Sequence, residues 1–395
     1  MSNIAPTYLT RRLATFYALY FALLGCIAPY WGLFLQHKHF NPEQIGLLMG
    51  AFGLMRVVAP NLWAYWGRYF RSPLQMVRTS AVLTLLCFAF IGMVDTPLGM
   101  GVVMMLYGFF WAAMLPQYEL MTMQACANEV GAYSRIRVWG SLGFVVTVLA
   151  AGALFEQVSV GWLPLLMVVL IAVITLNSFR LPDGAAPKAV SPAPGAFWQL
   201  LRSRPVQVFI LMTILLQVSH GPYYTFFSIY LQQQGYPSSL IGVLWSVGVS
   251  AEVLLFWTFQ RLVHWCSWRL WCVISLIITA IRWWLVGTVA DVWWLLLLAQ
   301  LGHAFSFAVM HAVSMRYVQQ LFPPALQSRG QALYASVGFG LGGALGAFLS
   351  GWLWQPLGGA GVFMGAGVLA LAGALVAWYG LRDSDSVLMS AENKK

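Results

Sequence analysis

Long runs of apolar residues without charge dominate this sequence, and they constrain its fold more than any other feature. A helix that crosses a lipid bilayer needs about 20 consecutive apolar residues, and twelve runs of this kind lie between charges or turn-forming residues. They cover residues 13–36, 43–66, 74–94, 97–125, 135–156, 160–180, 206–232, 238–262, 268–290, 292–316, 329–354 and 358–381. The chain is therefore predicted to be an all-α polytopic membrane protein with twelve transmembrane helices.

The charge content agrees with a membrane protein. Only 8% of the 395 residues are charged, whereas soluble domains contain about 25% charged residues. The net charge of +10 would suggest a nucleic-acid partner for a soluble protein. In a membrane protein it follows instead from the excess of Lys and Arg in cytoplasmic loops. We expect the lipid bilayer as a partner and no nucleic acid.

The distribution of Lys and Arg predicts the orientation of the chain. With the N-terminus on the cytoplasmic side, 18 of the 21 Lys and Arg residues fall in cytoplasmic segments, and only Lys38 falls in an outer loop. Because cytoplasmic loops carry excess positive charge, both termini are expected in the cytoplasm. The expected location is the inner membrane of a bacterial cell, with multiple passes.

A polar segment divides the apolar runs into two sets of six. Residues 181–205 are rich in Pro, Ala and charge and are predicted to form a cytoplasmic linker. The expected domains are therefore six-helix halves over residues 1–180 and 206–395. Ser-Leu-Gly-Phe at 141–144 recurs as Ser-Val-Gly-Phe at 336–339. Such a repeat is expected for two pseudo-symmetric halves related by an axis along the membrane normal.

Neither cysteine pairs nor catalytic motifs occur in the sequence. The five cysteines are scattered, without a Cys-x-x-Cys pair, so buried apolar packing is favoured over disulfides or metal binding. The sequence contains no His-Glu-x-x-His, Gly-x-Ser-x-Gly or phosphate-binding loop. We therefore expect no enzyme activity, no metal site and no cofactor.

Ionisable residues inside the apolar runs are the main functional signal. Arg56, Glu119, Glu252 and Arg282 lie within predicted helices, and Arg137 lies just inside another. Each would cost about 2.5–3.5 kcal/mol at the bilayer centre if it faced lipid. Two interpretations remain: ion pairs that lock helices together, or a path for a solute and protons. We favour the second, because intramembrane ionisable residues usually mark such paths.

Their depths separate these residues into two groups. Arg56, Glu252, Arg282 and His303 fall near the middle of their helices, where secondary transporters hold solute and coupling ion. Histidine titrates nearest to neutral pH, so His303 is a candidate proton carrier together with Glu252.

A second group lies closer to the cytoplasmic helix ends. Glu119 and Arg137 fall on neighbouring antiparallel helices where their side chains can meet, and Ser141 follows one turn after Arg137. Alternatively, Arg137 extends to the cytoplasmic surface. Tyr30 and Tyr223 follow Pro29 and Pro222 in the first helix of each half. Either they stack on the ring of a solute or they serve packing alone.

The segment RIRVWGSLG at residues 135–143, with Glu119 eighteen residues before Arg137, resembles the fifth helix of the lactose permease family, proton symporters of the major facilitator superfamily. Glu252, Arg282 and His303 follow in an order similar to that family. Arg56, together with the segments at 135–145, 221–252 and 303–317, looks more like the phenylpropionate permease branch. The resemblance implies the major facilitator fold and uptake of an aromatic carboxylate with protons.

Departures from the lactose permease pattern shift the expected coupling group. Ser306 stands where that family has a carboxylate three residues after the histidine, and Gln300 stands where it has a Lys. Coupling is therefore expected at Glu252 or His303, and a galactoside solute is disfavoured.

Together these features predict a monomeric secondary transporter that works by alternating access. It is expected to take up a small organic solute, preferably an aromatic carboxylate such as 3-phenylpropionate, together with protons. Alternatives are a sugar or nucleoside symporter, a drug efflux antiporter, and a polytopic membrane enzyme or receptor. The expected solute contacts are Arg56, Glu119, Arg137, Ser141, Arg282, Tyr223 and Tyr30, and the expected proton-coupling residues are Glu252 and His303.

Overall fold

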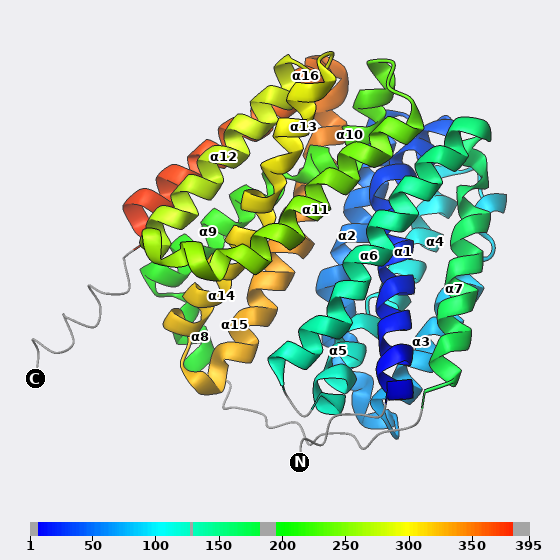
Figure 1. Ribbon diagram of the computed structural model, residues 1–395, viewed down its shortest axis with the longest axis horizontal. Helices are drawn as coiled ribbons and strands as arrows, with labels where there is room; N and C mark the ends of the chain where they lie inside the picture. Colours follow the sequence, from blue (N-terminus) through cyan, green and yellow to red (C-terminus); the bar gives the residue numbers. More distant parts are fainter. Residues whose placement is uncertain (1–6, 127–128, 182–194, 382–395) are drawn as a thin grey trace, which may run out of the picture. The chain divides into compact units, whose positions relative to one another are not determined.

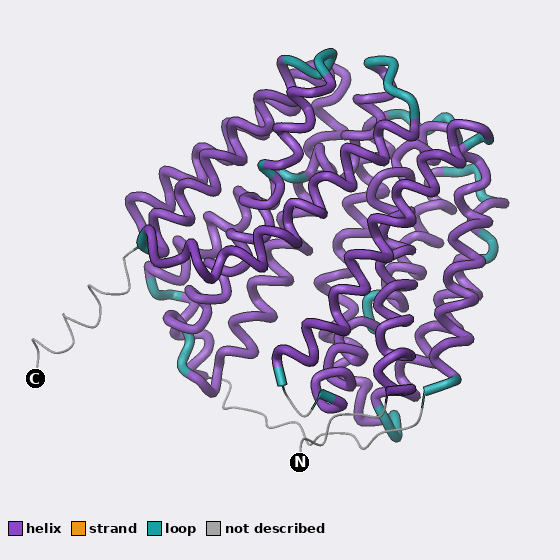
Figure 2. The backbone as a smooth tube through the Cα atoms, in the orientation of Figure 1, coloured by secondary structure: helices purple, strands orange, loops and turns teal. Residues whose placement is uncertain are grey.

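A computed structural model describes residues 7–126, 129–181 and 195–381. These residues form helices joined by short loops, and the described chain contains no strand (Figure 2). The helices before residue 182 are α1 (Thr7–His37), α2 (Pro42–Trp66), α3 (Pro73–Phe88), α4 (Pro97–Trp111), α5 (Met114–Ala125), α6 (Val130–Gln157) and α7 (Leu163–Phe179). The predicted all-α architecture is confirmed.

The remaining helices follow residue 194. They are α8 (Gly195–Leu201), α9 (Arg204–Ser219), α10 (Gly221–Gln233), α11 (Ser238–Leu262), α12 (Trp268–Thr288), α13 (Trp293–Leu301), α14 (Met310–Leu321), α15 (Gln327–Tyr334) and α16 (Gly343–Gly380). Two π-helices, η5 (Phe305–Val309) and η7 (Ala335–Gly342), connect α13 to α14 and α15 to α16. The helix α8 lies within the predicted linker, most of whose other residues are outside the described ranges.

Eleven helical segments of the described chain are long and apolar enough to cross a membrane. Ten match predicted spans one to one, and the eleventh, Pro324–Gly380, covers the last two. Its 57 residues would measure about 86 Å as one helix, far more than a hydrocarbon core of about 30 Å. Gly358 interrupts the helix with φ 68 and ψ 169, a conformation that side chains with a Cβ disfavour. This break divides the segment into two lengths that can each span.

Local sequence determines where several helices begin. Pro42, Pro73 and Pro97 occupy first-turn positions of α2, α3 and α4, where the missing N–H of proline costs nothing. The preceding Asn41, Ser72 and Thr96 accept hydrogen bonds from backbone N–H groups of the first turn. These caps satisfy donors that lipid could not.

Contacts divide the chain into two compact units. Unit 1 comprises Met1–Lys188 and Tyr224–Ser246, and unit 2 comprises Ala189–Tyr223 and Val247–Lys395. The boundary between the units therefore falls within α10 and α11. The predicted domain limits at 180 and 205 stay predictions.

Within unit 1, α1 packs along α6 (Figure 1). Gly143 of α6 lies directly against the backbone of Ala18 in α1, where a Cβ would overlap it. This contact explains why the RIRVWGSLG segment carries glycine. Within unit 2, α16 packs against α9 and α12, and the apolar core includes Phe209, Leu276 and Ala377.

Candidate functional site

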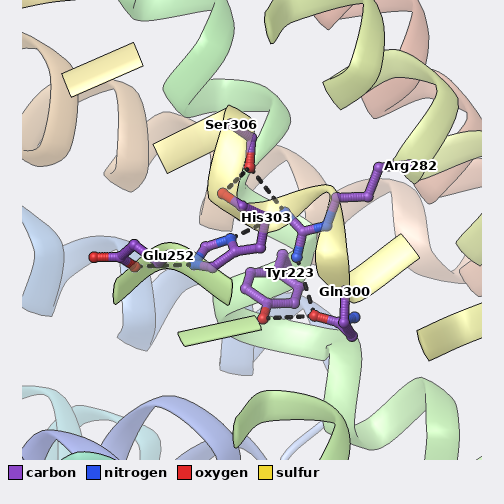
Figure 3. Close-up of polar contacts among 6 residues, drawn as sticks. All are labelled: Tyr223, Glu252, Arg282, Gln300, His303 and Ser306. Carbon is purple, nitrogen blue, oxygen red and sulfur yellow. Dashed lines mark hydrogen bonds and ion pairs between the residues drawn. The ribbon is translucent and has the colours of Figure 1, made fainter. Parts of the chain in front are cut away.

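Six polar side chains meet inside unit 2 (Figure 3). They come from α10, α11, α12, α13, the π-helix η5 and, for His303, the short segment between α13 and η5. The cluster comprises Tyr223, Glu252, Arg282, Gln300, His303 and Ser306. Arg282 is 1% exposed and His303 is 4% exposed, so the packed helices shield a formal charge and a titratable ring from solvent.

The buried guanidinium of Arg282 is surrounded by acceptors and aromatic rings. Its Nη1 donates to Ser306 Oγ at 3.2 Å and lies 3.2 Å from His303 Nδ1, and its Nη2 donates to Gln300 Oε1 at 3.3 Å. The rings of Tyr223 and Trp283 have centroids 4.3 and 4.2 Å from the guanidinium carbon. These contacts replace the hydration that the charge loses on burial.

The contact with Arg282 defines the tautomer of His303. A guanidinium has donors only, so His303 Nδ1 accepts and the ring proton resides on Nε2. That nitrogen lies 3.7 Å from Glu252 Oε2. His303 therefore lies between a cation and a carboxylate and presents a different ring nitrogen to each (Figure 3).

Irregular turns in two predicted spans position this cluster. The seventh predicted span separates into α9 and α10 at His220, and Tyr223 lies in the first turn of α10. In the tenth span, α13 ends at Leu301 and η5 begins two residues after His303. The backbone stays close to helical at both places, and π-helical turns are frequent at functional sites.

Close packing of α11 brings Glu252 to the cluster. Gly248 lies one turn before Glu252, and a Cβ at Gly248 would be 3.3 Å from Gln300 Oε1 and 3.4 Å from His303 Cβ. The absence of a side chain at Gly248 therefore lets α11 approach α13 closely enough for the Glu252 carboxylate to reach His303.

In the part of the chain that the structure describes, the predicted site residues of unit 1 do not form a hydrogen-bonded cluster like that of unit 2. The guanidinium of Arg137 lies 4.0 Å from the ring centroid of Phe21 and 5.6 Å from that of Tyr17. Glu119 interacts electrostatically with Arg137, but the described chain shows no ion pair of 4.0 Å or less between them. The direct contact that the sequence allows is therefore replaced by interaction at longer range.

The other predicted solute contacts in unit 1 have distinct surroundings. The Tyr30 hydroxyl donates to the Val148 carbonyl at 2.7 Å and is buried, which joins α1 to α6. Ser141 is partly buried on α6, four residues after Arg137. Arg56 is exposed on α2 and interacts electrostatically with Tyr20.

The structure thus brings together four predicted residues, Tyr223, Glu252, Arg282 and His303, whose roles stay predictions. It adds Trp283, which is not among the residues that the sequence predicts for the site. Trp283 covers the Arg282 guanidinium, and its indole N–H donates to Ser219 Oγ at 3.3 Å. The only sequence signal for it is its position beside Arg282.

Known proteins are similar to this chain in sequence over most of its length. Residues 10–364 match the model of the MFS_1-like family. The chain is 31% identical over 366 residues to the probable 3-phenylpropionic acid transporter of Escherichia coli (strain K12), covering 92% of this chain and 95% of that protein. It is 24% identical over 370 residues to the maltose permease of Geobacillus stearothermophilus, covering 91% and 92%.

Solved structures agree on the fold. The nucleoside transporter NupG, in a mutant form, superposes with a TM-score of 0.85 at 17% identity, covering 95% of this chain and 100% of that chain. A POT family transporter superposes with a TM-score of 0.74 at 13% identity, covering 95% and 98%.

The family match and the 31% identical relative show that the protein is a multi-pass membrane transporter of the major facilitator type, not an enzyme. Within that class, the chain belongs to the MFS_1-like family.

Proposed function

We propose that this transporter takes up an aromatic monocarboxylate together with a proton, by alternating access. It would act as a monomer in a bacterial inner membrane, with both termini in the cytoplasm. The substrate class is supported by the 31% identical relative, a probable 3-phenylpropionic acid transporter. The observation that carries proton coupling is the contact of Arg282 with His303 Nδ1 at 3.2 Å.

This contact makes the cluster sensitive to proton arrival. While Nδ1 accepts from Arg282, the ring is neutral and its Nε2 proton faces Glu252. A second proton on His303 turns Nδ1 into a donor, which places two cationic groups against each other. Arg282 and His303 must then separate, so α12 and α13 cannot keep the same packing. A second proton on Nδ1 would therefore change the conformational equilibrium of unit 2, and Glu252, which faces Nε2, would stabilise the imidazolium that forms.

Transport in reconstituted vesicles tests this function. Purified protein in proteoliposomes is given an inward proton gradient and labelled 3-phenylpropionate. We expect accumulation above the level in protein-free vesicles, and collapse of the accumulation by a protonophore. Accumulation that is unchanged by the protonophore would exclude proton coupling. Absence of uptake of every aromatic acid tested would exclude this substrate class.

Glu252→Gln separates coupling from binding. The neutral amide keeps the shape of the carboxylate but cannot exchange a proton, so we expect exchange of internal for external solute to persist while gradient-driven accumulation is lost. Glu156→Gln is the matched control, because Glu156 is an exposed carboxylate near the end of α6. Full accumulation by Glu252→Gln would remove Glu252 from the proton path.

A competition panel distinguishes the alternative solutes. The maltose permease relative supports a sugar as second candidate, so maltose and a nucleoside are added in excess during uptake. We expect inhibition by aromatic acids alone. Export of amphipathic dyes against the gradient would instead indicate an efflux antiporter.

A further inference from the structure

Two buried hydrogen-bond donors of α4 have no partner among the described residues. They are the hydroxyl of Tyr107 and the indole Nε1 of Trp111. Tyr107 is 2% exposed and Trp111 is 4% exposed. The two residues are four apart on one helix and therefore share a face. Buried donors of this kind are usually hydrogen-bonded, so this face of α4 is suited to a ligand that accepts hydrogen bonds.

Nearly parallel aromatic rings surround these donors. The Phe52 ring stacks on Tyr107 at 5.6 Å with an interplanar angle of 4° and lies 6.2 Å from Trp111 at 14°. Tyr20 of α1 stacks on Trp111 at 4.9 Å and 15°. Three helices thus supply ring planes of one orientation, along which another flat ring can align.

A cation adjoins this aromatic group. Arg56 lies one turn after Phe52 on α2 and interacts electrostatically with Tyr20 and Tyr107. Among the described residues, no carboxylate lies within 4.0 Å of its side chain. An unneutralised guanidinium within a membrane span is expected to face water or an anionic solute.

The other two intramembrane arginines already have close protein neighbours. Arg282 has three polar contacts and two aromatic rings around its guanidinium. The guanidinium of Arg137 lies 4.0 Å from the ring centroid of Phe21 and interacts with the hydroxyl of Tyr133, and with Glu119 at longer range. Arg56 is therefore the intramembrane arginine best placed to bind a carboxylate.

We propose that Arg56, Tyr107 and Trp111 form the carboxylate-binding part of the solute site, with Tyr20 and Phe52 beside the solute ring. This proposal rests on the proposed function. It identifies the residues of unit 1 that would favour a carboxylic acid over a neutral solute. A guanidinium and an indole N–H are donors only, and a carboxylate is an acceptor only. A sugar hydroxyl, which also donates, would find only the Tyr107 oxygen as an acceptor among these three groups.

Binding to the purified full-length protein tests this subsite. The affinities of 3-phenylpropionate and of its neutral analogue 3-phenylpropan-1-ol are measured for the wild type, Tyr107→Phe and Trp111→Phe. Each substitution removes a donor and keeps an aromatic ring. We expect each to weaken binding of the acid by about tenfold, the usual loss for a hydrogen bond to a charged group, and to weaken binding of the alcohol less, because its hydroxyl accepts only a neutral hydrogen bond.

Two further variants keep the test decisive. Arg56→Gln changes an exposed side chain, so the fold is retained, and we expect loss of the preference for acid over alcohol. Tyr118→Phe is the matched control, because Tyr118 is a buried tyrosine stacked on Phe16 outside the subsite. Wild-type affinity for the acid in Arg56→Gln, or in both aromatic variants, would overturn the subsite alone. Absence of acid binding by the wild type would overturn the proposed function as well.

Discussion

Arg282 and His303 restrict each other's chemistry, and this pair is the central feature at the scale of single residues. The guanidinium can only donate, so its contact with Nδ1 at 3.2 Å requires a neutral imidazole. The sequence predicts both residues near the bilayer midplane but not which ring nitrogen faces which partner. That information depends on the orientations of α12 and α13, which residue spacing alone does not specify.

Substitution of His303 separates its structural role from its proton. In His303→Asn, the amide oxygen occupies the branch position of Nδ1 and can still accept from Arg282. In His303→Leu, Arg282 loses that acceptor, and we expect a loss of about 2 kcal/mol of stability. Thermal unfolding in detergent measures the difference. We expect neither variant to accumulate solute, while His303→Asn stays as stable as the wild type. Equal destabilisation by both variants would contradict the acceptor role of Nδ1.

Several residue-level features lie outside what a sequence pattern indicates. The sequence predicts Tyr30 as a solute contact from its position beside Pro29, and this role stays a prediction; the structure adds that its hydroxyl donates to the Val148 carbonyl. No sequence pattern indicates Tyr107 and Trp111, because aromatic residues in an apolar run usually serve packing. What marks them is the combination of buried donors without a partner among the described residues, parallel neighbouring rings and the nearby Arg56.

At the scale of elements, the sequence predicts the transmembrane spans but not the irregular turns within them. Ten of the predicted spans match ten helical segments, because hydrophobic length alone determines them. No local sequence motif predicts the π-helix η5 or the turn between α9 and α10. Both depend on how the neighbouring helices pack. These irregular turns position His303 and Tyr223, so the sequence predicts the cluster's members better than its geometry.

The close approach of α11 to α13 gives a prediction at this scale. In Gly248→Ala, the new methyl group would meet Gln300 and His303 at 3.3–3.4 Å, so α11 must shift by a few tenths of an ångström and move Glu252 away from His303. We expect solute exchange to continue and gradient-driven accumulation to fall. Counterflow and accumulation assays on the same vesicles measure the two rates.

Gly365→Ala is the matched control, since Gly365 lies in α16 with no atom within 4 Å of an added Cβ. It should behave as the wild type. An equal loss of exchange and accumulation in Gly248→Ala would indicate general damage to the helix packing rather than a change in coupling.

At the scale of the whole molecule, the two units carry different chemistry. Unit 2 holds the buried cluster of Glu252, His303 and Arg282, and unit 1 holds Arg56 beside aromatic rings. In the proposed function, the solute would bind mainly on unit 1 and the proton on unit 2. Alternating access would then couple the two sites through the movement of the units.

Proton movement during solute entry tests proton-coupled uptake most directly. Proteoliposomes in lightly buffered medium without an imposed gradient receive 3-phenylpropionate while the external pH is recorded, and protein-free vesicles correct for passive entry of the acid. We predict an immediate rise in external pH with the wild type and none with Glu252→Gln. Solute entry through the wild-type protein without any protein-dependent rise in pH would contradict proton symport.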